Sequence, residues 1–457
     1  MKVGNELKSN NLFSAFVGIF FLFALGSIGI RSRWIFLLIA AVSMLLGIRG
    51  KTLRYISLTE FRNNWILFVF PIFIFFLFPN SRHETDVINS MIYIAIVTFA
   101  FLLIKTDRRE VTLVFKLFAI AGIIVALYIS FFRVFTDLYM EWIIPFLPEK
   151  IALNVSDNFR FGYGVAIGNS YTFGDYIIML GAATVLGLDI RTEGKFFRYK
   201  VILGVFVVGL IMEGRKGELL CGLMTIVLVY LIYIQPRKLK NTKTLAIVAI
   251  LMVIASIVGV LVLSKYGYLV RFQIMFEKML SSQSNSDADF TSGRLELWNS
   301  AIKVFMDHPL LGVGWGRFAN YTTGVFQETY EGQTIRDVHN VLLQLLCETG
   351  MIGTLLIISP IVRCFVVILK HARYIKNISG KNNFGTQCNV FALTVLIFHV
   401  TVSMLDPNLY NQYFWCMLSF AFVVEEYALS ELYGGSLMAS NYNIKRRVQS
   451  KLLVENI

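Results

Sequence analysis

The feature that most constrains this chain is a series of apolar stretches, many of them long enough to cross a lipid bilayer as a helix. A bilayer core about 30 Å thick needs roughly 20 apolar residues per helical crossing. Backbone polar groups find no water in hydrocarbon, and a helix satisfies them internally. Hydrophobic residues make up 56% of the 457 residues, whereas a soluble chain of this size needs more polar surface. The sequence therefore predicts an all-α, polytopic bundle of transmembrane helices.

Hydropathy predicts about twelve spans, of which the second and the seventh are short. They lie near 12–30, 33–48, 63–79, 87–104, 112–134, 171–188, 200–213, 217–234, 244–264, 340–369, 388–405 and 412–429. The first of them follows a polar start and has no small-residue cleavage pattern after it. We therefore expect a membrane helix there and not a cleaved signal peptide.

Basic residues predict how the bundle is oriented. They gather in alternate short loops at 49–54, 105–109, 191–200 and 237–243, and again in the tail at 445–447. Cytoplasmic loops carry such an excess of Lys and Arg, so these loops and both termini are expected inside. Arg31 and Arg33, in the first outer turn, are exceptions. The net charge of +13 is thus explained by membrane orientation, and no nucleic-acid partner is expected.

Four parts follow from this topology. They are 1–264 with nine spans and an outer loop near 135–170, a large outer loop at 265–338, spans ten to twelve within 339–430, and a cytoplasmic tail at 431–457. Helical spacing of apolar residues predicts amphipathic helices in the large loop, at Tyr268–Leu280 and at about Ser292–Asp307. In the second helix Leu295, Trp298, Ile302 and Phe305 fall on one face, and Pro309 is expected to end it.

Two arginines on the outer side are candidates for binding an anion. Arg215 lies in the sequence EGRKGE between two apolar runs, next to Lys216, and Arg294 lies at the start of the second loop helix. A guanidinium group offers a planar fork that matches phosphate, and the amides at a helix start also attract anions. A solvated turn for Arg215 and an exposed first-turn position for Arg294 are the plain alternatives, and the residues alone leave both open.

Histidine is rare in the chain, and one is placed where it could act as a base. His339, followed by Asn340, lies at the mouth of the tenth span. Its side chain titrates near neutral pH, which suits a general base, although a polar residue at a helix start is the alternative. His399 lies inside an apolar span, where a satisfied interior histidine is the simpler account.

Two patterns look like binding motifs but are better explained structurally. GVGWG at 312–316 lacks the Lys-Ser/Thr of a phosphate loop and has no strand before it, so a tight turn with close backbone approach is favoured. Asp287-Ala-Asp289 resembles a metal-binding DxD but lies in a Ser-rich linker, where a solvated segment is favoured. The five cysteines form no CxxC pair. No metal and no cofactor are expected.

The order of these segments resembles a known family. GRKGE at 214–218, SGRLELWNSAIKVFMDHPLLGVGWGRF at 292–318 and VHNVLLQLLCETGMIG at 338–353 are similar to the bacterial O-antigen ligase and O-antigen polymerase superfamily. RFGYGVAIGNS at 160–170 looks like that family's earlier outer loop. Family members take a glycan from an undecaprenyl-pyrophosphate carrier. Ligases attach it to lipid A–core, and polymerases attach it to another carrier-linked repeat unit.

The resemblance implies a metal-independent membrane glycosyltransferase of lipopolysaccharide or exopolysaccharide biosynthesis. It implies an active site on the periplasmic face of the bacterial inner membrane, where Arg215 and Arg294 hold pyrophosphate and His339 activates the acceptor hydroxyl. Attack from the face opposite the pyrophosphate would invert the anomeric centre. Further substrate contacts are expected from Arg160, Asn169, Lys216, Trp298, Gly314 and Asn340. Membrane lipids and a chain-length regulator are the other expected partners.

The sequence leaves three functions open. Val341 stands where many ligases carry a second polar residue, which slightly favours a polymerase over a ligase. A transporter is the third, because twelve spans with both ends inside also describe the major facilitator architecture, and Gly47–Arg54 falls where that family has a similar loop. That loop lacks the expected acidic residue, and transporter sites lie at the bilayer midplane, whereas the candidate residues here gather at the outer surface.

Overall fold

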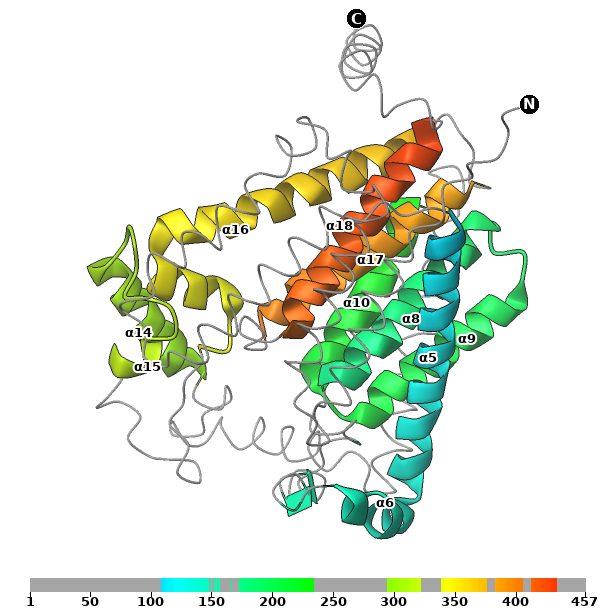
Figure 1. Ribbon diagram of the computed structural model, residues 1–457, viewed down its shortest axis with the longest axis horizontal. Helices are drawn as coiled ribbons and strands as arrows, with labels where there is room; N and C mark the ends of the chain where they lie inside the picture. Colours follow the sequence, from blue (N-terminus) through cyan, green and yellow to red (C-terminus); the bar gives the residue numbers. More distant parts are fainter. Residues whose placement is uncertain are drawn as a thin grey trace, which may run out of the picture.

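The computed structural model describes residues 108–147, 172–233, 294–321, 338–375, 383–405 and 412–433, with a few single positions between 149 and 165. Within these residues every regular element is a helix and there is no strand (Figure 1). The prediction of an all-α fold is confirmed for this part of the chain.

Four of the described helices are long and apolar enough to cross a membrane. They are α5 (Arg108–Val134), α8 (Thr172–Arg191), α16 (Val341–Tyr374) and α17 (Phe384–Ser403). Beside them lie α9 (Phe197–Glu213), α10 (Lys216–Tyr233) and α18 (Gln412–Tyr433). After α5 come the short α6 (Thr136–Trp142) and the 3-10 turn η3 (Ile144–Phe146), within the segment predicted as the first outer loop.

These helices coincide with seven of the predicted spans, from 112–134 to 412–429. The spans predicted near 12–30, 33–48, 63–79, 87–104 and 244–264 lie outside the described residues, as does the helix predicted at Tyr268–Leu280. The count of twelve spans therefore stays a prediction.

Helices α8 and α17 form the centre of the bundle, and nearly all of their side chains are buried. Small residues let α5 pack closely against α8 and α9. A Cβ built on Gly122 of α5 would lie 3.0 Å from the Cα of Gly181 in α8. One built on Gly209 of α9 would lie 2.7 Å from the Cβ of Ala126. Small residues at such contacts are the usual way for membrane helices to gain packing, because lipid supplies no hydrophobic force between helices.

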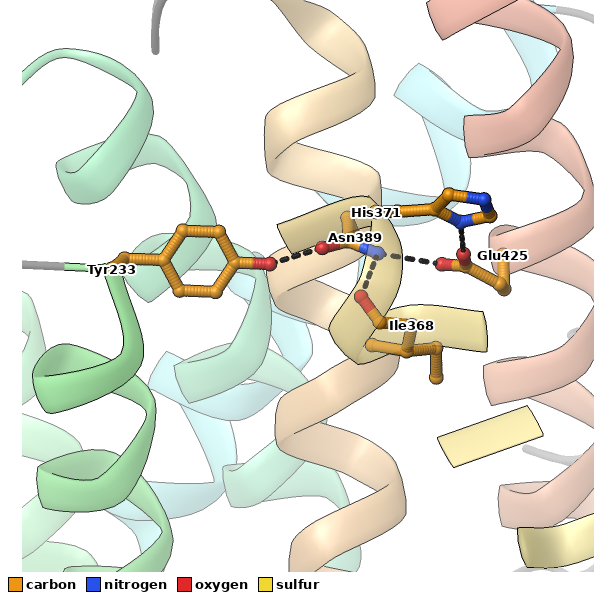
Figure 2. A network of polar contacts seen from close by, with 5 residues as sticks. All are labelled: Tyr233, Ile368, His371, Asn389 and Glu425. Atoms are coloured by element: carbon orange, nitrogen blue, oxygen red, sulfur yellow. Dashed lines mark hydrogen bonds and ion pairs between the residues drawn. The ribbon is translucent and has the colours of Figure 1, made fainter. Parts of the chain in front are cut away.

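A buried polar network joins α10, α16, α17 and α18 (Figure 2). Asn389 of α17 is its hub: Nδ2 donates to the carbonyl oxygen of Ile368 at 3.3 Å and to Glu425 Oε2 at 2.9 Å. Tyr233 donates its hydroxyl to Asn389 Oδ1, and His371 pairs through Nδ1 with Glu425 Oε1. Polar groups in an apolar interior are costly unless they find partners. The network therefore fixes the register of the four helices at this end of the bundle.

Away from the bundle, α14 (Arg294–Asp307) and α15 (Phe318–Tyr321) pack on the N-terminal part of α16 (Figure 1). The second loop helix is thus confirmed from Arg294 onward, and it ends before Pro309 as predicted. On the apolar face predicted for this helix, Leu295 and Ile302 are exposed. Leu297, Ala301 and Val304 form a second apolar face of α14, and this face is the one buried. Trp298 and Phe305, which lie between the two faces, are half-buried.

Helix α16 is interrupted at Gly350, whose φ of 64° and ψ of −169° are not helical. The interruption leaves backbone groups on either side without helical partners, and the turn after α14 supplies them. The bonds run from Val313 N to Cys347 O (2.9 Å), Gly314 N to Glu348 O (3.0 Å), Met351 N to Pro309 O (2.8 Å) and Ile352 N to Leu310 O (3.2 Å). We call this contact the turn–kink junction.

Glycine is required on both sides of the turn–kink junction. A Cβ built on Gly312 would lie 2.3 Å from the carbonyl carbon of Glu348, and one on Gly350 would lie 2.3 Å from that of Leu310. Both glycines also have a positive φ. The prediction of a tight turn with close backbone approach at 312–316 is therefore confirmed.

Replacing Asn389 by Leu should destabilise the bundle, because Glu425, Tyr233 and the Ile368 carbonyl all lose a buried partner. Leaving a buried polar group unsatisfied costs roughly 1–3 kcal/mol, so the protein in detergent should unfold several degrees lower. Thr394→Val is the matched control, since the hydroxyl of Thr394 is buried in the same helix but bonds to Val390 O within it. Equal melting temperatures for the two variants would contradict this role for Asn389.

Replacing Gly312 by Ala should disrupt the turn–kink junction, because the new methyl group overlaps backbone that cannot rotate away. Overpacking typically costs about 1–3 kcal/mol, and the positive φ adds strain. We expect a lower unfolding midpoint and faster limited proteolysis of the loop that contains α14. Gly204→Ala in α9 is the control, because nothing lies within 4 Å of its added Cβ. The prediction fails if both variants behave like the unmodified protein.

Candidate functional site

Arg215 lies in the short turn between α9 and α10. Gly214, with a φ of 74°, ends α9 in the left-handed conformation typical of a helix C-terminus. The side chain of Arg215 is only 13% exposed. Its Nη1 lies 3.3 Å from Asp175 Oδ2 in α8, and its Nη2 pairs with Glu218 Oε1 in the first turn of α10. A freely solvated turn does not describe this residue.

Three carboxylates and two guanidinium groups gather around this turn. Glu213, the last residue of α9, is fully buried and interacts electrostatically with Asp175, Glu218, Arg215 and Arg133. Buried charges are tolerated only where opposite charges and hydrogen bonds compensate for lost water. The guanidinium of Arg215 is therefore held in a fixed position by carboxylates from neighbouring helices.

Sequence reasoning missed these carboxylates as partners of Arg215. Glu213 and Glu218 lie in the sequence that was singled out, but Asp175 is 40 residues away. The available signal was that each is an acidic residue at the end of an apolar span, where ionisable groups are often functional.

His339 has a φ of 54°, which is rare for a residue with a side chain. Residues on both sides of it are fixed. The carbonyl of Val338 accepts a 3.1 Å hydrogen bond from Trp298 Nε1 in α14. Asn340 caps α16, accepting from Leu343 N at 3.0 Å, and its Nδ2 donates to Met404 O at 3.2 Å. Strained backbone of this kind persists only where the surroundings enforce it, and it gathers at functional sites.

A short series of contacts links the segments that carry the three candidate catalytic residues. A Cβ built on Gly217, two residues after Arg215, would lie 3.3 Å from Leu405 Cδ1. Met404, the residue before Leu405, receives the hydrogen bond of Asn340. Trp298, one turn along α14 from Arg294, bonds to Val338. The start of α10, the end of α17, the start of α16 and α14 are therefore connected in space at one end of the bundle (Figure 1).

The other candidate residues have different positions. Trp298 and Asn340 take part in the linking contacts. The amide of Gly314 donates to Glu348 O within the turn–kink junction, which is a structural contact. Arg294 is the half-buried first residue of α14. Lys216 begins α10, with its side chain outside the described part, and Arg160 and Asn169 lie wholly outside it. Their contacts with a substrate, and a cavity shared by Arg215, Arg294 and His339, stay predictions.

Glu348 is a further buried residue that the sequence did not single out. Its Oε2 accepts from Gly316 N at 3.0 Å and its Oε1 from Phe318 N at 3.5 Å. The carboxylate thus binds the amides that follow the glycine turn. His399 is buried in α17 beside Tyr176, with 6.3 Å between ring centroids, in agreement with the interior position expected for it.

Metal ligands form no cluster in the part of the chain that the structure describes. Among its His, Cys, Asp and Glu residues no group of three is placed to hold an ion. The five cysteines are buried, and no disulfide joins any two of them. Asp287 and Asp289 lie outside the described residues.

Comparison with known proteins gives one finding. The sequence model of a family described as O-antigen ligase matches residues 201–358, which run from α9 through Arg215, α14 and His339 into α16. No curated protein matches the chain. This family comprises glycosyltransferase-like enzymes, and together with the four candidate spans it indicates an integral protein of the inner membrane. The match confirms, over these residues, the resemblance to the O-antigen ligase and polymerase superfamily noted in the sequence.

Proposed function

We propose that this protein transfers a glycan from an undecaprenyl-pyrophosphate carrier to the hydroxyl of an acceptor sugar, as an O-antigen or exopolysaccharide polymerase. The site would face the periplasm, with both termini in the cytoplasm. The observation that carries the proposal is the series of contacts between the starts of α10 and α16, the end of α17, and α14. These contacts connect the segments of Arg215, His339 and Arg294.

The leaving group is a pyrophosphate, so the transition state gains negative charge that needs a positive partner. A guanidinium has five N–H donors in a planar fork, which matches the oxygens of a phosphate, and Asp175 and Glu218 lie beside that of Arg215. The carboxylates hold the group in one orientation before substrate arrives, as electrostatic catalysis requires. Removing one such donor typically costs on the order of 100–1,000-fold in rate.

Arg215 alone cannot supply a positive potential, because Asp175 and Glu218 already compensate its charge. The proposed site therefore depends equally on Arg294. This residue begins a helix of 14 residues, and the exposed amides and dipole at a helix start add to its attraction for an anion. The two arginines would act together on one diphosphate.

His339 is the proposed general base. It would take the proton from the acceptor hydroxyl as the oxygen attacks the anomeric carbon, while the electron pair of the breaking C–O bond leaves on the pyrophosphate. A positioned base is typically worth about 100–10,000-fold. Attack opposite the leaving group inverts the anomeric centre. The reaction needs no metal, since guanidinium groups serve as the positive partner.

A ligase is the second candidate, with the same chemistry and lipid A–core as the acceptor. Val341 is buried in the hydrophobic core, so the position where many ligases are polar is packed with apolar side chains here, which favours the polymerase. Deletion in the native host separates the two candidates. Loss of a polymerase leaves single repeat units on core, whereas loss of a ligase leaves bare core and polymer accumulates on the carrier.

Replacing Arg215, Arg294 or His339 by Ala should each reduce transfer about 100-fold or more, because each removes a group that acts on the transition state. The measurement is the length distribution of the surface glycan on gels, at equal protein level in the membrane. Lys303→Ala, on the exposed side of α14, and Arg198→Ala, at the far end of α9, are charge-matched controls that should stay active. Normal glycan from all three site variants would refute the proposal.

Asp175→Asn should leave the fold intact but lower the rate, because the ion pair that orients Arg215 loses its charge. A misplacement of about 1 Å can cost up to about 100-fold. Transfer of labelled glycan in reconstituted vesicles measures the loss. Asp189→Asn, at the opposite end of α8, is the control, since its partner Tyr230 can donate equally to an amide oxygen. Full activity of Asp175→Asn beside an inactive Arg215→Ala would show that Asp175 has no positioning role.

A further inference from the structure

Large apolar side chains are exposed on both sides of the turn–kink junction. At the end of α14 and in the turn, Met306 is 70% exposed, Leu310 65% and Leu311 50%. At the start of the long part of α16, Met351 is 49% exposed, Ile352 44% and Leu355 58%. We call these six residues the junction patch.

Backbone hydrogen bonds hold the two halves of the junction patch against each other. Met351 N bonds to Pro309 O and Ile352 N to Leu310 O, so the turn lies directly against the first residues after the kink. Ile302, one turn before Met306 and also exposed, extends the apolar surface along α14. The apolar face of α14 that does not pack on α16 thus leads into this surface.

The same surface continues along α16. Val362 and Val366 are 52% and 41% exposed, and with Met351 and Leu355 they follow positions i, i+4, i+11 and i+15. At 100° per residue these four lie within one stripe about 60° wide. Only 33% of the apolar window of α16 is buried inside the protein, as expected for a span whose other side faces lipid. Arg363, the one charge between Met351 and Leu369, lies off this stripe.

The length of this part of α16 gives the depth of the patch. The run from Met351 to Leu369 rises roughly 28 Å at 1.5 Å per residue, which is close to the roughly 30 Å of bilayer hydrocarbon. Lys370 follows directly after it. The kink at Gly350 therefore falls at the other edge of the hydrocarbon, and the turn bonded to Met351 and Ile352 falls at the same depth.

We propose that the junction patch is a lipid-binding surface, immersed in the acyl chains of the membrane leaflet next to α14. The membrane is the occupant because the patch continues, without a break in the bonded backbone, the side of α16 that faces lipid. Lys303 and His308, both exposed beside the patch, would lie at the level of the headgroups. Helix α14 is then held at the membrane surface instead of standing in the aqueous space. This proposal does not depend on the glycosyltransferase activity.

The test places a fluorophore on a cysteine introduced at Leu310 or, separately, at Met306. All five native cysteines are buried, so the label goes to the introduced thiol, and both positions are exposed enough to accept it without repacking. The full chain is reconstituted in phosphatidylethanolamine–phosphatidylglycerol vesicles. Quenching is measured with lipids that carry bromine on the acyl chains and with aqueous iodide. Val362→Cys is the lipid-facing reference, and Lys195→Cys, in the exposed turn before α9, is the aqueous reference.

We expect labels at 310 and 306 to be quenched by brominated lipid to an extent comparable with the label at 362. Their quenching by iodide should be several-fold weaker than that of the label at 195. Labels at both positions that follow the aqueous reference would overturn the proposal. Shielding from both quenchers would also overturn it, because protein and not lipid would then cover the patch.

Discussion

The arrangement of α14 and the first turns of α16 depends on one backbone-to-backbone contact, the turn–kink junction. Helix α16 breaks at Gly350, and the amides and carbonyls released by the break are satisfied by the turn around Gly312. Because the contact is made by main-chain atoms at distances that exclude a Cβ, it leaves little freedom to either partner. It therefore fixes α14, which begins with Arg294, relative to the first turns of α16, which follow His339. Glu348, buried below the turn, reinforces the same contact through its carboxylate.

Electrostatics govern the other side of the proposed site. Arg215 sits at the end of four packed helices, between carboxylates that are themselves buried. Such an arrangement contributes little to the stability of the fold, since each charge has lost its water. Its benefit is geometric: a guanidinium held at two of its nitrogens does not reorient when an anion binds. A site built to stabilise a leaving pyrophosphate would need this rigidity, together with a second positive group that carboxylates have not already neutralised.

Features of the fold that depend on neighbouring residues could be predicted from the sequence, whereas contacts between residues far apart in the chain could not. Hydropathy is a local property, and the spans predicted over 112–134, 171–188 and 388–405 match α5, α8 and α17 within a few residues. The break at Gly350 was not predicted, because the segment 340–369 is mostly apolar and was interpreted as one helix. The glycine turn at 312–316 was recognised, but its partner lies more than 30 residues later in the chain. Asp175 was missed as the partner of Arg215, and the hub at Asn389 was missed, for the same reason. The predicted apolar face of α14 is only partly covered by α16, which shows that the sequence of a helix with two apolar stripes does not reveal which one is buried.

Helix α16 connects the buried polar network around Asn389 with the turn–kink junction. One of its ends is fixed in the bundle by Ile368 and His371, through the network centred on Asn389 (Figure 2). Its other end is fixed by Asn340 to the end of α17 and by the turn–kink junction to α14. Between them, Ile357 and Cys364 pack in the hydrophobic core, whereas Leu355, Val362 and Val366 are exposed. The position of His339 is therefore set by core packing along one side of a long helix and by polar and backbone contacts at its two ends. In a membrane such contacts hold the helices firmly in place, because a polar group that leaves its partner finds no water to replace it.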